Sequence, residues 1–347
     1  MRALAVMLVV VGHAGLGGIV PGGSGVTIFF GISGFLITYL LLRERDRTGT
    51  FGIGKFYSRR LLKIGPPLVA IIVVPTLVWA IWNEVDWSAF SAQAFFYYNW
   101  FKADGQMAGV LPGSGVVWSL SIEEQFYVVV AVVWLLVAGM RTALKWLTVL
   151  AVTMILVSTA ARVVIATSAS VAEADRIYYG SDTRFDAIGW GVLTAVVYFS
   201  WGHGRLQSLQ RQFGRTWIPL TALAAYLASL VIRDPWFRDT FRFSIQSIAT
   251  CAVILYGFAA TQTTFKNAFD SVVGVRLVQV VGLASYSIYL VHYGMDELVD
   301  LGVGGWTGAG AASAAVIAVK VLVSVLAGVV LYYLIEKPFE KVRARLR

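Results

Sequence analysis

Residues 118–138, WSLSIEEQFYVVVAVVWLLVA, decide the fold, because two adjacent carboxylates are followed by a long apolar run. An α-helix needs about 20 mostly apolar residues to cross the hydrocarbon core of a bilayer. In lipid the backbone must satisfy its own hydrogen bonds, and a helix does this internally. We therefore interpret residues 118–138 as a transmembrane helix.

Comparable apolar runs recur along the whole chain. Of its 347 residues, 58% are hydrophobic and 14% are charged, whereas a soluble domain carries about 25% charged residues. This composition excludes an ordinary soluble domain, and it excludes disorder, which requires low hydrophobicity and high charge. The runs are also longer than the alternating strands of a membrane barrel. We predict an all-α polytopic membrane protein of about ten transmembrane helices, at residues 3–20, 25–42, 64–82, 118–138, 146–167, 186–201, 216–232, 242–260, 277–295 and 311–335.

The basic residues predict how these helices are oriented. If the first helix starts in the cytoplasm, the alternation places 20 Lys and Arg residues on the cytoplasmic side and 6 outside. Cytoplasmic loops carry the excess of basic residues, so we expect both termini in the cytoplasm of a bacterial inner membrane. The net charge of +9 is explained in this way without a nucleic-acid partner. We expect residues 1–347 to form a single domain, with no fused extracytoplasmic domain.

The longest segment between the predicted spans covers residues 83–117. It is rich in aromatic side chains, among them Phe95, Tyr97 and Trp100. Aromatic residues gather where the membrane meets water. The segment therefore predicts an interfacial helix.

Arg2 and His13 lie 11 residues apart in the first predicted span. On a helix this spacing brings them within about 20° of the same face, with a rise of about 16 Å. We expect the arginine at the cytoplasmic surface and the histidine about halfway across the membrane. An ionisable residue at that depth indicates a function, and an imidazole can take and return a proton near neutral pH. The alternative is a histidine that only bonds a neighbouring helix.

Two carboxylates, Glu123 and Glu124, open the run described first. Ser121 and Glu124 fit a capping box, which gives Glu124 a structural role. Glu123 points about 100° away and is not used by that cap. We expect Glu123, or else Glu124, to orient His13 as the third member of a catalytic triad orients its histidine.

Basic residues cluster at the entrance of the third predicted span, in Phe56-Tyr-Ser-Arg-Arg-Leu-Leu-Lys-Ile-Gly-Pro-Pro67, which contains Arg59, Arg60 and Lys63. Arg60 and Lys63 share a helix face because they are three residues apart. One interpretation is anchoring by lipid phosphates. The other is a cradle for the phosphates of a nucleotide-bearing donor.

Alternating charges open the sixth predicted span, at Asp182, Arg184 and Asp186. They fit either a set of ion pairs on the outer surface or a group that binds an acceptor. The pattern alone does not decide between the two.

A polar stripe crosses the ninth predicted span. Ser285, Tyr289 and His292 follow one another at i, i+4 and i+7 and so share a helix face. Polar residues inside a membrane face a cavity or another helix. Substrate contact and bonding between helices are both open.

Taken together, these motifs resemble acyltransferase family three, the membrane acyltransferases that modify bacterial glycans and macrolide antibiotics. Five motifs occur in order over nearly the whole chain, and the closing Glu336-Lys-Pro338 also matches. The resemblance implies a ten-helix core and an acyl-CoA donor bound from the cytoplasmic side. It implies that His13 is the catalytic residue and that Arg2 is its partner or contacts the donor.

The sequence departs from the family at two places. Lys63 occupies a position that is usually arginine, and lysine lacks the bidentate fork of a guanidinium. The family usually carries residues ahead of the Arg2 motif, often Asp-Gly-Leu, so we expect a natural start upstream of Met1.

Our interpretation is an O-acyltransferase that moves an acyl group, acetyl in the first place, from acetyl-CoA or another acyl-CoA to a hydroxyl. The acceptor contains a sugar and is a macrolide, a glycolipid or a cell-surface glycan. His13 serves as general base, and a covalent acyl-histidine route stays open. No metal is expected. Arg2, Arg59, Arg60 and Lys63 are the expected donor contacts, and Asp182, Arg184, Asp186, Tyr289 and His292 the expected acceptor contacts.

The alternative of a different class is a proton-coupled transporter or flippase. Intramembrane His, Arg, Glu and Asp side chains could serve a proton relay. Inverted repeats would support that function, and we find none in the sequence. Binding of acetyl-CoA by the purified protein would separate the two classes.

Overall fold

The structure is a computed structural model and describes residues 1–106, 110–168, 174–259, 264–303 and 314–345. The regular elements of these residues are helices, as predicted, and none of them is a strand. The elements are α1 (Arg2–Val11), the π turn η1 (Gly12–Leu16), α2 (Gly22–Thr48), α3 (Ile53–Leu68), the π turn η2 (Val69–Val73), α4 (Val74–Trp79), α5 (Trp87–Ala94), α6 (Tyr98–Ala103), the 3₁₀ turn η3 (Ser114–Val117), α7 (Trp118–Val137), α8 (Ala143–Ser168), α9 (Ala174–Tyr179), α10 (Ser181–Gly202), α11 (Gln207–Phe213), α12 (Trp217–Val231), α13 (Pro235–Thr240), α14 (Arg242–Ala259), α15 (Thr264–Gly274), α16 (Arg276–Leu283), α17 (Ser285–Val303), α18 (Ala314–Leu331), the π turn η5 (Tyr332–Glu336) and α19 (Lys337–Ala344).

Within the described residues, six helical segments are long and apolar enough to cross a membrane, and each coincides with a predicted span. They are Gly22–Thr48, Ile53–Trp79, Ser114–Val137, Ala143–Ser168, Arg242–Ala259 and Ala314–Ala344. Residue 260 of one predicted span and residues 311–313 of another lie outside the described residues. The protein is therefore an all-α protein with several membrane helices, and the number ten stays a prediction.

Two of the other predicted spans differ from the structure. The first, 3–20, is the shorter helical segment Arg2–Leu16. At about 1.5 Å per residue, such a segment falls short of the roughly 30 Å hydrocarbon core. The prediction of one helix over 277–295 is wrong, because the chain breaks at Ala284, between α16 and α17.

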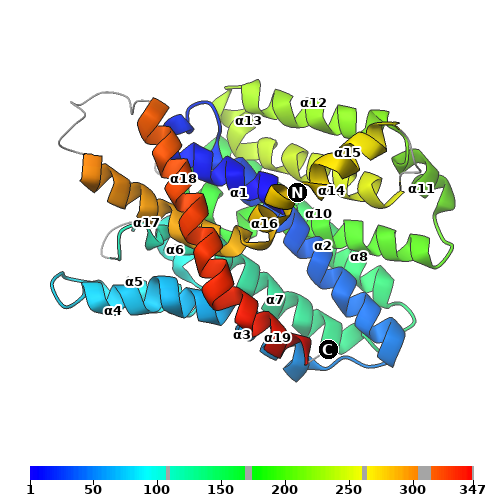
Figure 1. The fold of residues 1–347 in the computed structure, drawn as a ribbon. Coiled ribbons are helices and arrows are strands. Elements are labelled where there is room, and N and C mark those ends of the chain that lie inside the picture. The colour runs from blue at the N-terminus through cyan, green and yellow to red at the C-terminus, as the bar shows by residue number, and fades with distance from the viewer. Residues whose placement is uncertain (107–109, 169–173, 260–263, 304–313, 346–347) are drawn as a thin grey trace.

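Helix α10 lies at the centre of the packing, against α2 and α8, while α17 packs on α18 and α12 on α14 (Figure 1). The crossing of α2 and α10 depends on glycine. A Cβ atom on Gly34 would overlap the carbonyl oxygen of Ile188, and one on Gly191 would overlap that of Gly31. Small residues allow membrane helices to approach this closely, and the close approach fixes α2 and α10 as the wall behind the site.

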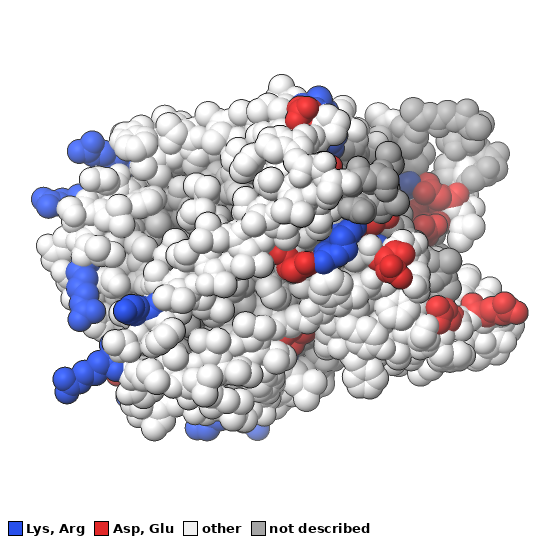
Figure 2. All heavy atoms as spheres, turned by 180° about the vertical axis from the view of Figure 1, so that it is seen from behind, with Lys and Arg blue, Asp and Glu red and all other residues white. Residues whose placement is uncertain are grey.

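The two ends of the bundle differ in charge. The C-terminal ends of α2, α7 and α10 lie together, since Arg45 donates to the carbonyl of Met140 at 2.9 Å and Asp46 pairs with His203 at 3.3 Å. Figure 2 shows Lys and Arg gathered along one edge and most Asp and Glu on the opposite half. We call the end at Arg45 the basic end. The acidic end holds α6, α9 and the starts of α2 and α10. Which end faces the cytoplasm stays a prediction.

Candidate active site

A cavity of about 70 Å³ lies between α2, α3, α7 and α17, and the start of α1 closes one side of it. Its walls are largely apolar, but four charged side chains line it: Arg2, Arg60, Lys63 and Glu123. Small-molecule sites are typically apolar hollows with a few placed polar groups. Residues of four predicted motifs meet in this cavity, since Ser285 and Tyr289 line it as well.

Arg2 lines this cavity, and its predicted place at the cytoplasmic surface stays a prediction. Its Nε donates to the hydroxyl of Ser285 at 3.0 Å, which ties the start of α1 to the start of α17. The carboxylates of Glu123 and Glu336 are the negative charges that act on the guanidinium. Arg2 therefore offers a positive charge to the cavity from within the bundle.

The three basic residues of helix α3 lie on two different faces of the helix. Arg60 and Lys63 line the cavity, and the guanidinium carbon of Arg60 lies 4.5 Å from the ring centroid of Tyr127. Arg59 instead pairs with Glu44 of α2 at 2.7 Å. The structure brings together Arg2, Arg60 and Lys63, and it does not bring Arg59 to them.

Glu123 faces the same cavity and does not meet His13. Its Oε2 accepts hydrogen bonds from Ser33 at 3.1 Å and from Tyr127 at 3.0 Å, and those two hydroxyls are 2.5 Å apart. The expectation that Glu123 orients His13 is therefore wrong in this structure. The carboxylate bonds Ser33 of α2 and Tyr127 of its own helix, and not the π turn that carries His13.

The capping box predicted at Ser121 and Glu124 is wrong as well. The turn η3 leads directly into α7, so Ser121 lies inside the helix and its hydroxyl donates to the carbonyl of Val117 at 3.4 Å. Glu124 does not line the cavity, and its Oε1 is buried with no partner among the described residues.

His13 lies in the π turn that follows α1. Single π turns are frequent at functional sites, and this one needs Gly15, whose φ of 127° is open to glycine and strained for other residues. The turn directs the imidazole toward α17, where His292 is fully buried. The side chain of His13 is exposed. Its ring lies nearly perpendicular to that of Tyr293, with 5.3 Å between the two ring centroids.

The hydrogen bonds of the two histidines define their tautomers. Nδ1 of His292 lies 2.7 Å from the carbonyl of Tyr289, and a carbonyl only accepts, so this nitrogen carries the proton. In the neutral imidazole Nε2 of His292 is then an acceptor, and it lies 3.0 Å from Nδ1 of His13. Nδ1 of His13 donates this bond. Nε2 of His13 is left with a free lone pair, which is what a general base requires.

Tyr289 links the histidine pair to the cavity. Its ring lines the cavity, and its hydroxyl bonds Ser119 at 2.7 Å and the carbonyl of Val116 at 3.1 Å. One turn further along α17, His292 meets His13. The predicted polar stripe is therefore confirmed as a shared face of α17, and it runs from the cavity to His13.

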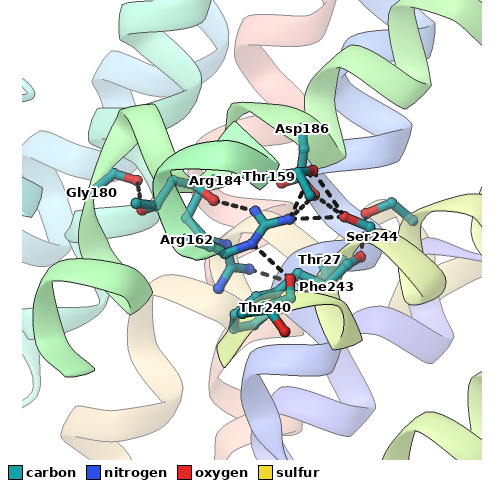
Figure 3. A network of polar contacts seen from close by, with 11 residues as sticks. Thr27, Thr159, Arg162, Gly180, Arg184, Asp186, Thr240, Phe243 and Ser244 are labelled. Carbon is teal, nitrogen blue, oxygen red and sulfur yellow. Dashed lines mark hydrogen bonds and ion pairs between the residues drawn. The ribbon is translucent and has the colours of Figure 1, made fainter. Parts of the chain in front are cut away.

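Asp186 belongs to a buried polar cluster apart from the central cavity (Figure 3). Asp186 pairs with Arg162 of α8 at 2.7 Å, and neither side chain is exposed. Arg162 also donates to the carbonyl of Thr240 at 2.9 Å and to the hydroxyl of Ser244 at 2.8 Å. Of the two interpretations of this motif, ion pairs on the outer surface are therefore wrong for Asp186. Arg162 is a residue that the sequence analysis missed, although a charge inside an apolar helix is a signal that a partner exists.

The other two charges of this motif have different surroundings. Asp182 pairs with Arg176 of α9. Arg184 is fully buried, lies 3.9 Å above the ring centroid of Phe243 and donates to the hydroxyl of Thr27 at 3.0 Å. None of the three residues lines the central cavity. Their predicted contact with an acceptor stays a prediction.

Glu336 is a further residue of the site. Its Oε1 accepts from the backbone N–H of Ser287 at 3.0 Å and from the hydroxyl of Ser287 at 2.5 Å. This contact fixes η5 against the start of α17, close to Arg2. In the sequence, Glu336 was indicated only by the closing motif Glu336-Lys-Pro338. Among the described residues, no three His, Cys, Asp or Glu side chains form a group that could hold a metal.

Fold and site together define a polytopic membrane protein with an internal cavity that is lined by charged side chains. A family model described as "Acyltransferase domain" matches residues 1–334, so the chain belongs to this acyltransferase family, and the predicted resemblance is confirmed. The family supports an enzyme that takes an acyl donor and an acceptor.

Curated relatives carry names of the same kind. The chain is 25% identical over 352 residues to O-acetyltransferase OatA of Staphylococcus aureus (strain NCTC 8325 / PS 47), an alignment that covers 98% of the chain and 56% of the relative. It is 27% identical over 323 residues to Putative O-acetyltransferase SACOL0978 of Staphylococcus aureus (strain COL), covering 86% and 50%. The chain thus spans about half the length of these relatives. No solved structure matches it.

Proposed function

We propose that the protein transfers an acyl group, acetyl in the first place, from acyl-CoA to a hydroxyl of a sugar-containing acceptor, with His13 as general base. The family supports acyl transfer. The printed names of the relatives support O-acetylation. The donor, the acceptor and the base are our inference from the site.

The observation that carries the proposal is the chain of hydrogen bonds from Tyr289 through His292 to His13. It leaves Nε2 of His13 as an acceptor on an exposed imidazole. A positioned base of this kind contributes about 10²–10⁴-fold to the rate. A histidine that served only to bond helices would have no need of a defined free nitrogen.

The basic cavity supports coenzyme A as the carrier of the acyl group. Arg2, Arg60 and Lys63 offer three positive charges where α3 enters the bundle, and phosphates are bound strongly by such charge-assisted hydrogen bonds. The coenzyme would enter from the basic end, with its phosphates on these residues and its thioester directed along Tyr289 toward His13. Glu123 holds Tyr127 and Ser33 in place beside this route.

The reaction then follows with balanced protons. Nε2 of His13 takes the proton of the acceptor hydroxyl while the hydroxyl oxygen attacks the thioester carbonyl. The tetrahedral intermediate collapses, the C–S bond breaks, and the protonated His13 returns its proton to the leaving sulfur. The products are the acyl ester of the acceptor and coenzyme A with a free thiol.

The test is acyl transfer from radiolabelled acetyl-CoA by the purified full chain in lipid nanodiscs, against candidate macrolide, glycolipid and glycan acceptors. We expect His13→Ala to lower the rate about 10²–10⁴-fold. His203→Ala is the matched control, because His203 is exposed and pairs with Asp46 at the basic end. Transfer by His13→Ala at the wild-type rate would overturn the assignment of the base.

A further inference from the structure

A second hollow, of about 400 Å³, lies at the acidic end and shares no residue with the central cavity. It is formed by α6, the residues that follow it, and α9. The lining residues are Trp100, Phe101, Ala103, Asp104, Gln106 and Arg176. No step of the proposed reaction uses them.

The hollow combines the indole ring of Trp100 with several polar side chains. The guanidinium carbon of Arg176 lies 5.0 Å from the ring centroid of Trp100, and the indole is still 39% exposed. Gln106 donates to the carboxylate of Asp104 at 3.0 Å, and both side chains are exposed. The hollow is therefore lined by an aromatic ring, a carboxylate, an amide and a guanidinium.

The balance of charge selects the class of ligand. Arg176 is already paired with Asp182, and Asp104 adds a negative charge to the same hollow, which disfavours an anion. The guanidinium disfavours a cation. A neutral sugar ring fits both features, because its C–H face packs on an indole and its hydroxyls need donors and acceptors side by side.

Packed elements link this hollow with His13. Lys102 follows Trp100 by two residues and projects from another side of α6, where its ammonium lies 4.9 Å from the ring centroid of Tyr179 and next to Gly115 of η3. The turn η3 packs on α17, and Tyr293 of α17 contacts His13 with 5.3 Å between the two ring centroids. Helix α6 therefore connects the hollow, through η3 and α17, with the imidazole.

We propose that this hollow is a saccharide subsite, which binds one sugar unit of the acceptor on Trp100 while a neighbouring unit presents its hydroxyl to His13. The inference rests on the proposed function for the second half of that statement. Binding of sugar in the hollow is independent of the chemistry and can be measured alone.

The experiment is binding of the full chain, labelled and held in lipid nanodiscs, to an immobilised array of neutral, acidic and basic oligosaccharides. We expect binding to neutral glycans, and a loss of about tenfold in apparent affinity for Trp100→Ala, as for other aromatic anchors. Asp104→Ala is expected to act in the same direction. Trp217→Ala is the matched control, because Trp217 is 51% exposed on α12, away from the hollow.

Two results would overturn the subsite: binding of no neutral glycan by the wild type, or equal binding by Trp100→Ala and Trp217→Ala. Unchanged thermal stability of Trp100→Ala keeps a folding defect from being mistaken for a binding defect. His13→Ala, included on the same array, should bind glycan like the wild type. If His13→Ala still transfers acetyl while Trp100→Ala loses glycan, the proposed base fails and the subsite stands.

Discussion

Two groups of charged residues lie between the helices of this protein, and they differ in what surrounds them. Arg162 and Asp186 have no exposure and do not line the central cavity, and the guanidinium donates to carbonyls, a hydroxyl and the carboxylate. Arg60, Lys63 and Glu123 line that cavity. Charge alone therefore does not identify a functional site in a membrane bundle, whereas charge that faces a cavity does.

The difference has an energetic basis. Burial of a charge pair costs desolvation that is recovered only when the geometry and the remaining hydrogen bonds are good. The guanidinium of Arg162 and Oδ2 of Asp186 meet that condition, while Oδ1 of Asp186 is buried with no hydrogen-bond partner among the described residues. The basic side chains of the cavity carry hydrogen-bond donors that face it, and a phosphate-bearing ligand could accept from them. The first group should thus respond to mutation in stability, and the second in ligand binding.

The largest effect is expected for Asp186→Ala. The change leaves Arg162 charged, buried and unpaired, and breaking such a pair costs about 3–5 kcal/mol. Thermal unfolding in nanodiscs should show a large drop in midpoint. The control is Asp182→Ala, because the Asp182–Arg176 pair is partly exposed, 39% and 30% for the two side chains, and exposed pairs contribute about 0–1 kcal/mol. A stable but inactive Asp186→Ala protein would contradict the contrast between the two groups.

A smaller effect, on rate alone, is expected from the partner of the proposed base. In His292→Asn the side chain is too short to accept the hydrogen bond from His13, so the tautomer is no longer fixed and kcat should fall on the order of 10²-fold. In His292→Gln the amide oxygen can occupy the place of Nε2, and most of the activity should return. The measurement is kcat for both variants with the same acceptor.

Rescue by Gln but not Asn is an outcome that a packing role for His292 does not predict. Equal activity of the two variants and the wild type would separate His292 from the chemistry. In that case His13 would either act as a base whose tautomer is not fixed by His292, or would not be the base at all.

The sequence predicted the parts of this site that depend on one helix at a time. Apolar runs located the membrane helices, because a span of fixed length leaves a local pattern. The spacing of Arg60 and Lys63 predicted their common face, and that of Tyr289 and His292 predicted theirs. These predictions are confirmed since each depends only on the geometry of its own helix.

Contacts between helices were predicted less well. The sequence offered Glu123 as the partner of His13, but the packing of α7 directs that carboxylate to Ser33, while α17 supplies His292. For Asp186 the sequence left two interpretations open, because its partner, Arg162, lies 24 residues earlier on another helix. Which face of a helix meets which neighbour is decided by packing, and no local pattern records it.

The smallest effect of the three is expected inside the cavity. Lys63→Ala removes one of the charges proposed for the phosphates, and loss of one charge-assisted hydrogen bond should weaken acetyl-CoA binding roughly tenfold or somewhat more. Arg59→Ala is the control from the same helix, because Arg59 pairs with Glu44 and does not line the cavity. The dissociation constant of acetyl-CoA, measured by calorimetry, distinguishes them.

Lys63→Arg sharpens the same comparison. A guanidinium at this position can bind a phosphate with two parallel hydrogen bonds where an ammonium acts as a point charge, so affinity for acetyl-CoA should be kept or should rise a few-fold. If Arg59→Ala weakened donor binding as much as Lys63→Ala, exposure to the cavity would have no bearing on the donor. General attraction between the basic end and an anion would then explain the affinity, and it would weaken as salt is added. Contacts inside the cavity are screened less, so the proposal requires the loss in Lys63→Ala to persist at high salt.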